Sequence, residues 1–280
     1  MNSPRLNRLF RANGRCVILS FDHGLFGEPS WLKGLENIAD VVNAIASSEA
    51  HDGMTLPNGS ARVLQARMGR DKPSLLLRVD VTDAYLNERP AQLTAYRLDS
   101  AVARAVALDA VCVVAALLTY PDQPGLSRDC FANLDALRRD CDIAGMPLMV
   151  EILAMTDNRG VPLVQTNSKH IAPLVRQAME LGADLIKADP TEPVEDFSIL
   201  LDAAAGVPII ASGGIKADDE DILTRSAALM DAGASGLAYG RNIMWAKDPA
   251  LMTRVLLQVV HEGVSAEEAI ERYREQQTSG

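Results

Sequence analysis

The sequence has 280 residues, 48% of them hydrophobic and 23% charged, which is enough to bury a large core in one domain spanning residues 1–280. Its net charge of −10 argues against nucleic acid as a general partner, although a small phosphate needs only a local basic pocket. No apolar run approaches the roughly 18 residues of a membrane span, no apolar signal core follows the N-terminus, and the four cysteines show no CxxC spacing. We therefore expect a soluble cytoplasmic protein with reduced thiols and no membrane partner.

Strands and amphipathic helices alternate along the chain. The predicted strands are 16–21, a weak one at 53–56, 74–81, 111–118, 147–153, a short one with its core at 185–186, 208–211 and 236–239. The predicted helices are 4–11, 31–48, 60–68 with Ser60 as its N-cap, 100–108, 130–144, 171–181, 194–205, 219–230, 248–261 and 266–275.

These strands are nearly continuous in Val, Ile, Leu and Ala, which is typical of a parallel sheet covered by helices. Eight such units predict an α/β fold, a single (β/α)8 TIM barrel with a short N-terminal helix and a C-terminal helical extension. A doubly wound open sheet is the alternative, but no G-x-G-x-x-G follows the first strand, and its crevice would not collect the loops after strands six, seven and eight.

Lys187 lies within the short sixth strand, which Pro190 ends. An ammonium is costly to bury, so we expect some free amine near neutral pH, and a free amine can attack a carbonyl group. The alternative is that Lys187 is only a structural partner of an acid. Lys216 is the rival amine, but it follows two glycines and more readily begins the next helix or touches phosphate.

Other polar side chains interrupt strands whose two faces should both be buried, where a charge is costly unless it points into a site. Asp22 follows the first strand on the face of Ser20, Arg78 shares a face with Asp80, and Glu151 interrupts the fifth strand. These charges are expected to converge at the barrel mouth. Alternatively, Arg78 forms a structural ion pair with Asp80 or Glu151, and Asp22 only turns the chain.

Two glycine-bearing strand ends suit phosphate binding by backbone N–H groups and a guanidinium. Ser212, Gly213 and Gly214 follow the seventh strand, and Gly240 and Arg241 follow the eighth. In TIM barrels, these two loops are the usual phosphate site.

The histidines show no metal-binding spacing, so no metal site and no zinc-dependent chemistry are expected. His170 and His261 are expected on the surface. His23, beside Asp22, is a further candidate for contacting substrate, as is Arg78.

Taken in order, these motifs resemble the class I (Schiff-base) aldolases of the superfamily that contains deoxyribose-phosphate, archaeal-type fructose-bisphosphate and tagatose-bisphosphate aldolases. The resemblance runs from residue 15 to residue 242. It implies that Lys187 forms the Schiff base and that Asp22 handles hydroxyl or carbinolamine protons. It also implies a phosphate cradle made of Ser212, Gly213, Gly214, Gly240 and Arg241.

The fifth strand departs from the archaeal-type pattern, which has a Tyr-Pro-Arg-Gly motif there with a tyrosine for proton transfer. Glu151 occupies this region instead and resembles the acid of tagatose-bisphosphate-type enzymes, so it becomes the predicted general acid/base. The resemblance therefore implies a cofactor-free aldolase that cleaves or forms a C–C bond in a phosphorylated ketose or related sugar phosphate, in a homo-oligomer.

Two other functions fit the same residues. One is lysine-dependent, thiolase-like acyl transfer from a phosphorylated diketone to coenzyme A, which a related subgroup of barrels carries out. The other is a barrel that binds a sugar phosphate without catalysis.

Overall fold

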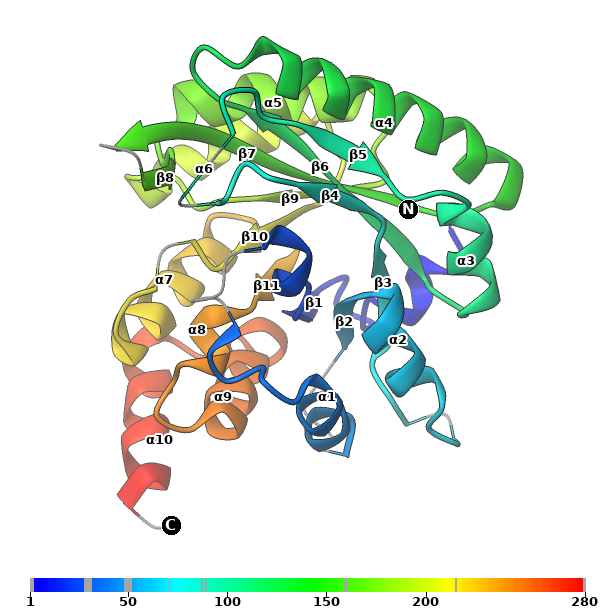
Figure 1. Ribbon diagram of the computed structural model, residues 1–280. Helices are drawn as coiled ribbons and strands as arrows, with labels where there is room; N and C mark the ends of the chain where they lie inside the picture. Colours follow the sequence, from blue (N-terminus) through cyan, green and yellow to red (C-terminus); the bar gives the residue numbers. More distant parts are fainter. Residues whose placement is uncertain are drawn as a thin grey trace.

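In this computed structural model, residues 3–27, 32–47, 52–69, 71–86, 88, 90–158, 161–214 and 216–278 are described. Eight parallel strands form a closed barrel in the order β6-β3-β2-β1-β11-β10-β9-β7, and β7 pairs back with β6. The predicted fold is thereby confirmed (Figure 1). The barrel strands are β1 (Cys16–Ser20), β2 (Gly53–Pro57), β3 (Ser74–Arg78), β6 (Cys112–Thr119), β7 (Leu148–Asn158), β9 (Leu185–Ala188), β10 (Ile209–Ser212) and β11 (Gly236–Tyr239).

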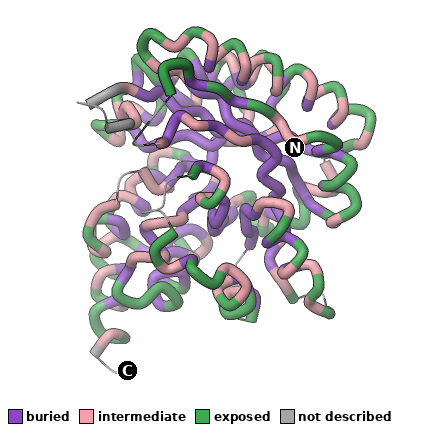
Figure 2. The backbone as a smooth tube through the Cα atoms, in the orientation of Figure 1, coloured by how far each residue is buried: buried purple, intermediate pink, exposed green. Residues whose placement is uncertain are grey.

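Helices surround the strands, and their outer faces carry most of the exposed residues (Figure 2). The α-helices are α1 (Ile38–Ser47), α2 (Asn58–Gln65), α3 (Ala101–Ala107), α4 (Pro124–Ala144), α5 (Ser168–Glu180), α6 (Phe197–Ala204), α7 (Asp219–Asp231), α8 (Arg241–Met244), α9 (Pro249–Glu262) and α10 (Ala266–Thr278). The 3-10 helices are η1 (Leu6–Arg8), η2 (His23–Phe26) and η4 (Val194–Asp196). Among the described residues, no helix is both long enough and apolar enough to cross a membrane.

Helix boundaries follow local capping chemistry. Asp248 caps α9 by accepting a hydrogen bond from the backbone N–H of Leu251 at 2.9 Å, and Pro249 fills the first helical position, where its missing N–H is harmless. The C-terminal helix α10 packs against α7 and α9, outside the barrel (Figure 1).

Several predicted boundaries were wrong for local reasons. The strand predicted over 74–81 breaks after Arg78, because β4 (Asp80–Thr82) turns away to pair with β5 (Ala95–Arg97). Ser60 lies inside α2 and donates its hydroxyl proton to the carbonyl of Pro57 at 3.3 Å, so it is not the N-cap. Helix α1 starts at Ile38, later than predicted, and α4 starts earlier, at Pro124.

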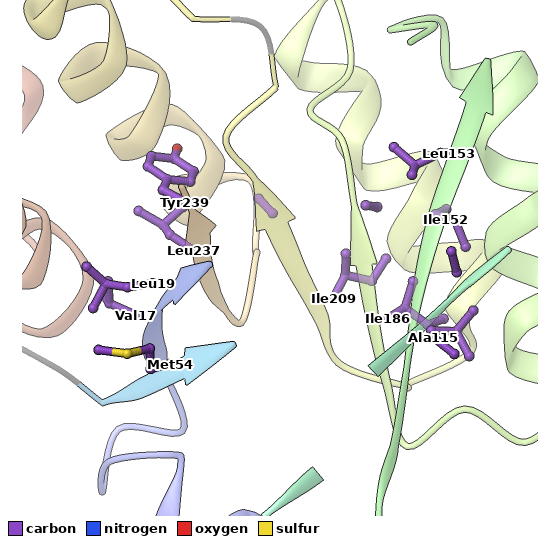
Figure 3. Close-up of a cluster of buried hydrophobic side chains, with 14 of the residues drawn as sticks. Val17, Leu19, Met54, Ala115, Ile152, Leu153, Ile186, Ile209, Leu237 and Tyr239 are labelled. Carbon is purple, nitrogen blue, oxygen red and sulfur yellow. The ribbon is translucent and has the colours of Figure 1, made fainter. Parts of the chain in front are cut away.

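Two apolar clusters fill the molecule. The larger one lies between the barrel and the helices and includes Val17 and Leu19 of β1 and Ile209 of β10 (Figure 3). The smaller one fills the barrel interior at the amino ends of the strands, where Leu6 and Leu9 of the N-terminal segment close the barrel like a plug. The same cluster contains Val111, just before β6, and these residues of the strands: Cys16, Ile18, Leu76, Cys112, Val114, Met149, Leu185, Ile210 and Ala238.

The barrel interior changes from apolar to polar along neighbouring strands β7 and β9. On β7 the inward positions run from Met149 to Glu151, and on β9 from Leu185 to Lys187. Because Met149 pairs with Leu185 and Glu151 with Lys187, the two strands make this change at the same height in the barrel. The polar ends of the strands therefore meet on one layer, at the carboxyl end.

Candidate active site

Lys187 on β9 lies beside Glu151 on β7. The two residues are partners in the parallel register of these strands, so both side chains enter the barrel interior. The Nζ atom of Lys187 lies 2.6 Å from Oε1 of Glu151, and the side chains are 9% and 11% exposed. The predicted lysine is thus part of a buried ion pair, with an acid close enough to exchange a proton with it.

Arg78 joins the acids of three different strand ends. Its Nε donates to Oδ2 of Asp22 at 2.7 Å and its Nη1 to Oδ1 of Asp80 at 3.2 Å, while Nη2 donates to Oε2 of Glu151. The guanidinium carbon lies 5.4 Å from the ring centre of Phe26. Because the Arg78 side chain is 0% exposed and each of its three nitrogens donates to a carboxylate, it holds the acids in place rather than facing a ligand.

Charge, rather than burial, sets the state of Glu151. Burial alone raises the pKa of this carboxyl group, but the positive charges and hydrogen bonds of Arg78 and Lys187 hold the pKa well below its usual range. At Asp80 burial prevails and raises the pKa, although Arg78 and the N–H of Ala116 oppose it. Glu151 is therefore a carboxylate at neutral pH and can accept a proton.

Asp22 and His23 follow β1 and line the same cavity as Lys187. Burial lowers the pKa of His23 from 6.5 to about 4, against the opposing charge of Asp22, so the imidazole is neutral at neutral pH. Gly240 packs against this turn. A Cβ atom there would lie 2.5 Å from Cε1 of His23 and 2.6 Å from the carbonyl oxygen of Ser20, so the close approach requires glycine.

The two glycine loops and Arg241 meet in this cavity. Gly214 has a φ of +59°, which suits glycine, and Nδ2 of Asn242 donates to the carbonyl of Gly213 at 2.6 Å, tying the loop after β10 to the one after β11. Burial lowers the pKa of Arg241, while nearby Asp189 opposes the shift. A cation that is costly to bury favours an anionic ligand.

Ser212 and Gly214 form hydrogen bonds within the loop. The Ser212 hydroxyl donates to Oδ1 of Asp189, and its oxygen accepts from the N–H of Gly214 at 3.3 Å. These two members of the predicted phosphate cradle line the cavity, but their polar groups already shape the loop.

Asp189 was missed from the sequence, although it stands two residues after Lys187 and this spacing puts both on one strand face. An apolar wall was missed as well. It consists of Phe26, Tyr85, Leu153 and Val164, which come from four separate elements and loops. The rings of Phe26 and Tyr85 pack with centroids 4.9 Å apart. Since Phe26 ends a short 3-10 helix and Tyr85 lies in a turn, no periodicity marks these two residues.

The remaining candidates lie away from the cavity. The Nζ atom of Lys216 donates to the carbonyl of Ala217 at 2.7 Å and pairs with Asp219 at 3.3 Å, so this lysine serves the start of α7. His170 is exposed, as predicted. His261 is not on the surface, because it hydrogen-bonds Asp52 at the other end of the barrel with its side chain 8% exposed.

Comparison with known families gives a match that covers most of the chain. A model described as "DeoC/LacD family aldolase" matches residues 16–246. An uncharacterized aldolase of Saccharolobus solfataricus is 28% identical over 95% of this chain and 96% of its own length. The class 1 fructose-bisphosphate aldolase of Thermoproteus tenax is 29% identical over 91% of this chain and 93% of its own.

A solved structure shows the same architecture. It is an archaeal fructose-1,6-bisphosphate aldolase whose catalytic lysine is covalently bound to the carbinolamine intermediate of the substrate. It is 27% identical to this chain with a TM-score of 0.77, over 92% of this chain and 98% of its own.

Proposed function

Because the chain belongs to the DeoC/LacD family of aldolases and is a class I aldolase, we propose that Lys187 is its Schiff-base lysine and that its substrate is a phosphorylated ketose or related sugar phosphate. The observation that carries the proposal is the 2.6 Å contact between Nζ of Lys187 and Oε1 of Glu151 inside the barrel. It places a nucleophile beside a base at the end of the barrel where such enzymes act.

Glu151 takes the first proton in this scheme. It accepts a proton from the Lys187 ammonium, and the free amine then attacks the substrate carbonyl to give a carbinolamine. The carboxylic acid so formed returns the proton to the carbinolamine hydroxyl, which leaves as water and gives the iminium. Part of the lowering of the Glu151 pKa comes from the charge of Lys187 itself, so the carboxylate becomes a stronger base as the lysine loses its proton, while Arg78 keeps it ionised between turnovers.

Asp22 acts on the bond that breaks. It accepts the proton of the substrate hydroxyl whose carbon becomes a carbonyl, while the electrons of the breaking C–C bond move into the iminium to give an enamine. The contact of Asp22 with Nε of Arg78 orients the carboxylate beside Glu151. In our proposal Arg78 itself positions both acids and does not touch substrate.

The phosphate group is assigned to Gly213, Gly240 and Arg241. Backbone N–H groups of the loops and a guanidinium provide the donors, and the negative phosphate offsets the cost of burying the cation. Ser212 and Gly214 support this site through their own hydrogen bonds. The neutral imidazole of His23 can donate one further hydrogen bond to substrate.

Borohydride reduction tests the nucleophile. The protein is mixed with a panel of phosphorylated ketoses, dihydroxyacetone phosphate first, reduced, and analysed by intact mass and peptide mapping. We expect a stable adduct on the peptide that contains Lys187, because a Schiff base reduces to a secondary amine. The adduct mass identifies the carbonyl substrate.

Two variants control this experiment. Lys187→Ala should lose the label completely, whereas Lys216→Met should keep it, since Lys216 is bound to Ala217 and Asp219 outside the cavity. Label on another lysine, or none across the panel, would overturn the assignment of Lys187.

A further inference from the structure

Asp189 lies in the cavity one inward position beyond Lys187. The two residues are separated by a single residue, so they share the interior face, about 7 Å apart along the strand direction. Asp189 is 6% exposed and lines the cavity together with Lys187, Glu151 and Arg241. A substrate held by Lys187 and Arg241 must therefore pass close to the Asp189 carboxylate.

The hydrogen bonding of Asp189 is incomplete. Oδ1 accepts from the hydroxyl of Ser212, whereas Oδ2 is buried and has no hydrogen-bond partner within the part of the chain that the structure describes. An unpaired buried acceptor is costly, and most buried carboxylate oxygens are hydrogen-bonded. Burial raises the pKa of the Asp189 carboxyl group, although the hydrogen bond from Ser212 and the charges of Lys187 and Arg241 oppose this shift.

The missing partner has to be a hydrogen-bond donor. A carboxylate oxygen repels a phosphate oxygen and gains nothing from a C–H group, whereas a hydroxyl group satisfies it. We propose that Asp189 is a specificity-determining residue, which accepts a hydrogen bond from a substrate hydroxyl on a carbon next to the reacting carbonyl. The site thus selects hydroxyketones over methyl ketones. This inference deepens the proposed function, because it concerns a group beside the same carbonyl.

Two probes isolate this hydroxyl group. Dihydroxyacetone phosphate and hydroxyacetone phosphate share the carbonyl and the phosphate, and only the first has the hydroxyl. Their dissociation constants are measured by calorimetry with the wild-type chain, Asp189→Leu and Asp189→Asn. A site that hydrogen-bonds a hydroxyl rejects the analogue lacking it, so the wild type should prefer dihydroxyacetone phosphate by about tenfold or more.

The two variants distinguish recognition of the substrate hydroxyl from a purely structural role of Asp189. Asp189→Leu has no acceptor and should bind the two probes within about threefold of each other. Asp189→Asn keeps an acceptor oxygen, so a clear preference for the hydroxyl should return. Equal affinity of the wild type for the two probes would overturn the inference, as would an Asp189→Leu variant that binds both probes more weakly by the same factor. Asp189 would then only support Ser212.

Borohydride trapping on the same samples keeps this proposal separate from the previous one. Calorimetry measures binding and needs no imine. If an imine is trapped but the hydroxyl is not preferred, the role of Asp189 is contradicted and the assignment of Lys187 stands. A preference that Asp189→Leu removes, together with no trapped imine, supports Asp189 and contradicts the assignment of Lys187.

Discussion

Each end of the barrel holds a cluster of charged side chains, but the two clusters differ in how completely their polar groups are hydrogen-bonded. At the amino end, Asp52 accepts three hydrogen bonds: from Nε of Arg11 at 2.6 Å, from the N–H of Val17 at 2.7 Å and from Nε2 of His261 at 2.7 Å. The apolar plug of Leu6 and Leu9 seals the interior just above it. Both oxygens of Asp52 are therefore hydrogen-bonded by described residues.

At the carboxyl end the polar groups border a cavity, and two of them are incomplete. Oδ2 of Asp189 and Oγ of Ser20 are buried without a hydrogen-bond partner among the described residues. A site that binds a ligand keeps acceptors and donors for that ligand. Of the two clusters compared, only the one beside the cavity has unpaired acceptors in the described part of the chain, although both oxygens of Glu151 are paired there.

Among the substitutions that test this comparison, the largest effect, a loss of turnover, is expected at Glu151. Glu151→Gln keeps size but removes the base, so turnover should fall roughly 10²- to 10⁴-fold in a steady-state aldol cleavage assay. The matched control is Asp80→Asn, which alters a different contact of Arg78, with Nη1, and should mainly lower the melting temperature. Unchanged turnover in Glu151→Gln would place Glu151 among the structural charges.

A smaller effect is expected at Arg241. Arg241→Ala removes the guanidinium proposed to hold phosphate and should weaken binding of a phosphorylated substrate by about 2–4 kcal/mol. An unphosphorylated analogue serves as the internal control and should bind almost equally well to both proteins. Equal losses for the two ligands would move Arg241 out of the phosphate site.

The smallest effect is expected on stability, from a change at Asp52 at the amino end of the barrel. For Asp52, burial raises the pKa, but the hydrogen bonds from His261 and Val17 and the nearby charges lower it below its ordinary value. Its contribution to stability is therefore present above the ordinary pKa of aspartate and is lost as pH falls through the lowered value.

Asp52→Asn should lower the free energy of unfolding at pH 7 by about 1–3 kcal/mol, measured by denaturant titration. The difference from the wild type should shrink below about pH 4, and trapping on Lys187 should be unaffected. A difference that stays constant across this pH range would show that the charge of Asp52 does not contribute.

The strands and the charged residues inside them could be predicted because both rest on short-range patterns. A strand buried on both faces reads as an apolar run, and Arg78, Glu151 and Lys187 stand out against it. Asp189 was overlooked because it falls after the apolar core of its strand, just before Pro190. The walls formed by Phe26 and Tyr85 depend on how loops fold over the mouth, which no local pattern records.

The ends of some strands and helices were mispredicted for a related reason. Tertiary hydrogen bonds decide where the third strand breaks, since the N–H of Val79 still bonds the carbonyl of Val114 at 3.0 Å before the chain turns into β4. Likewise, His261 occupies a position in its helix that the sequence pattern assigns to the surface. Its burial depends on Asp52, which only the folded barrel brings into contact with it.

The register of β1 has a consequence for the order of assembly. Cys16 of β1 pairs with Gly236 of β11, and a Cβ at Gly236 would lie 2.1 Å from the Cys16 carbonyl oxygen, so these backbones meet closely. Contacts between distant parts of a chain form slowly. Asp22, which follows β1, therefore joins Lys187 in a finished pocket only when the last strand has docked. During synthesis on the ribosome, Lys187 can meet Glu151 as soon as β9 pairs with β7, whereas Asp22 would join them only when nearly the whole barrel has emerged.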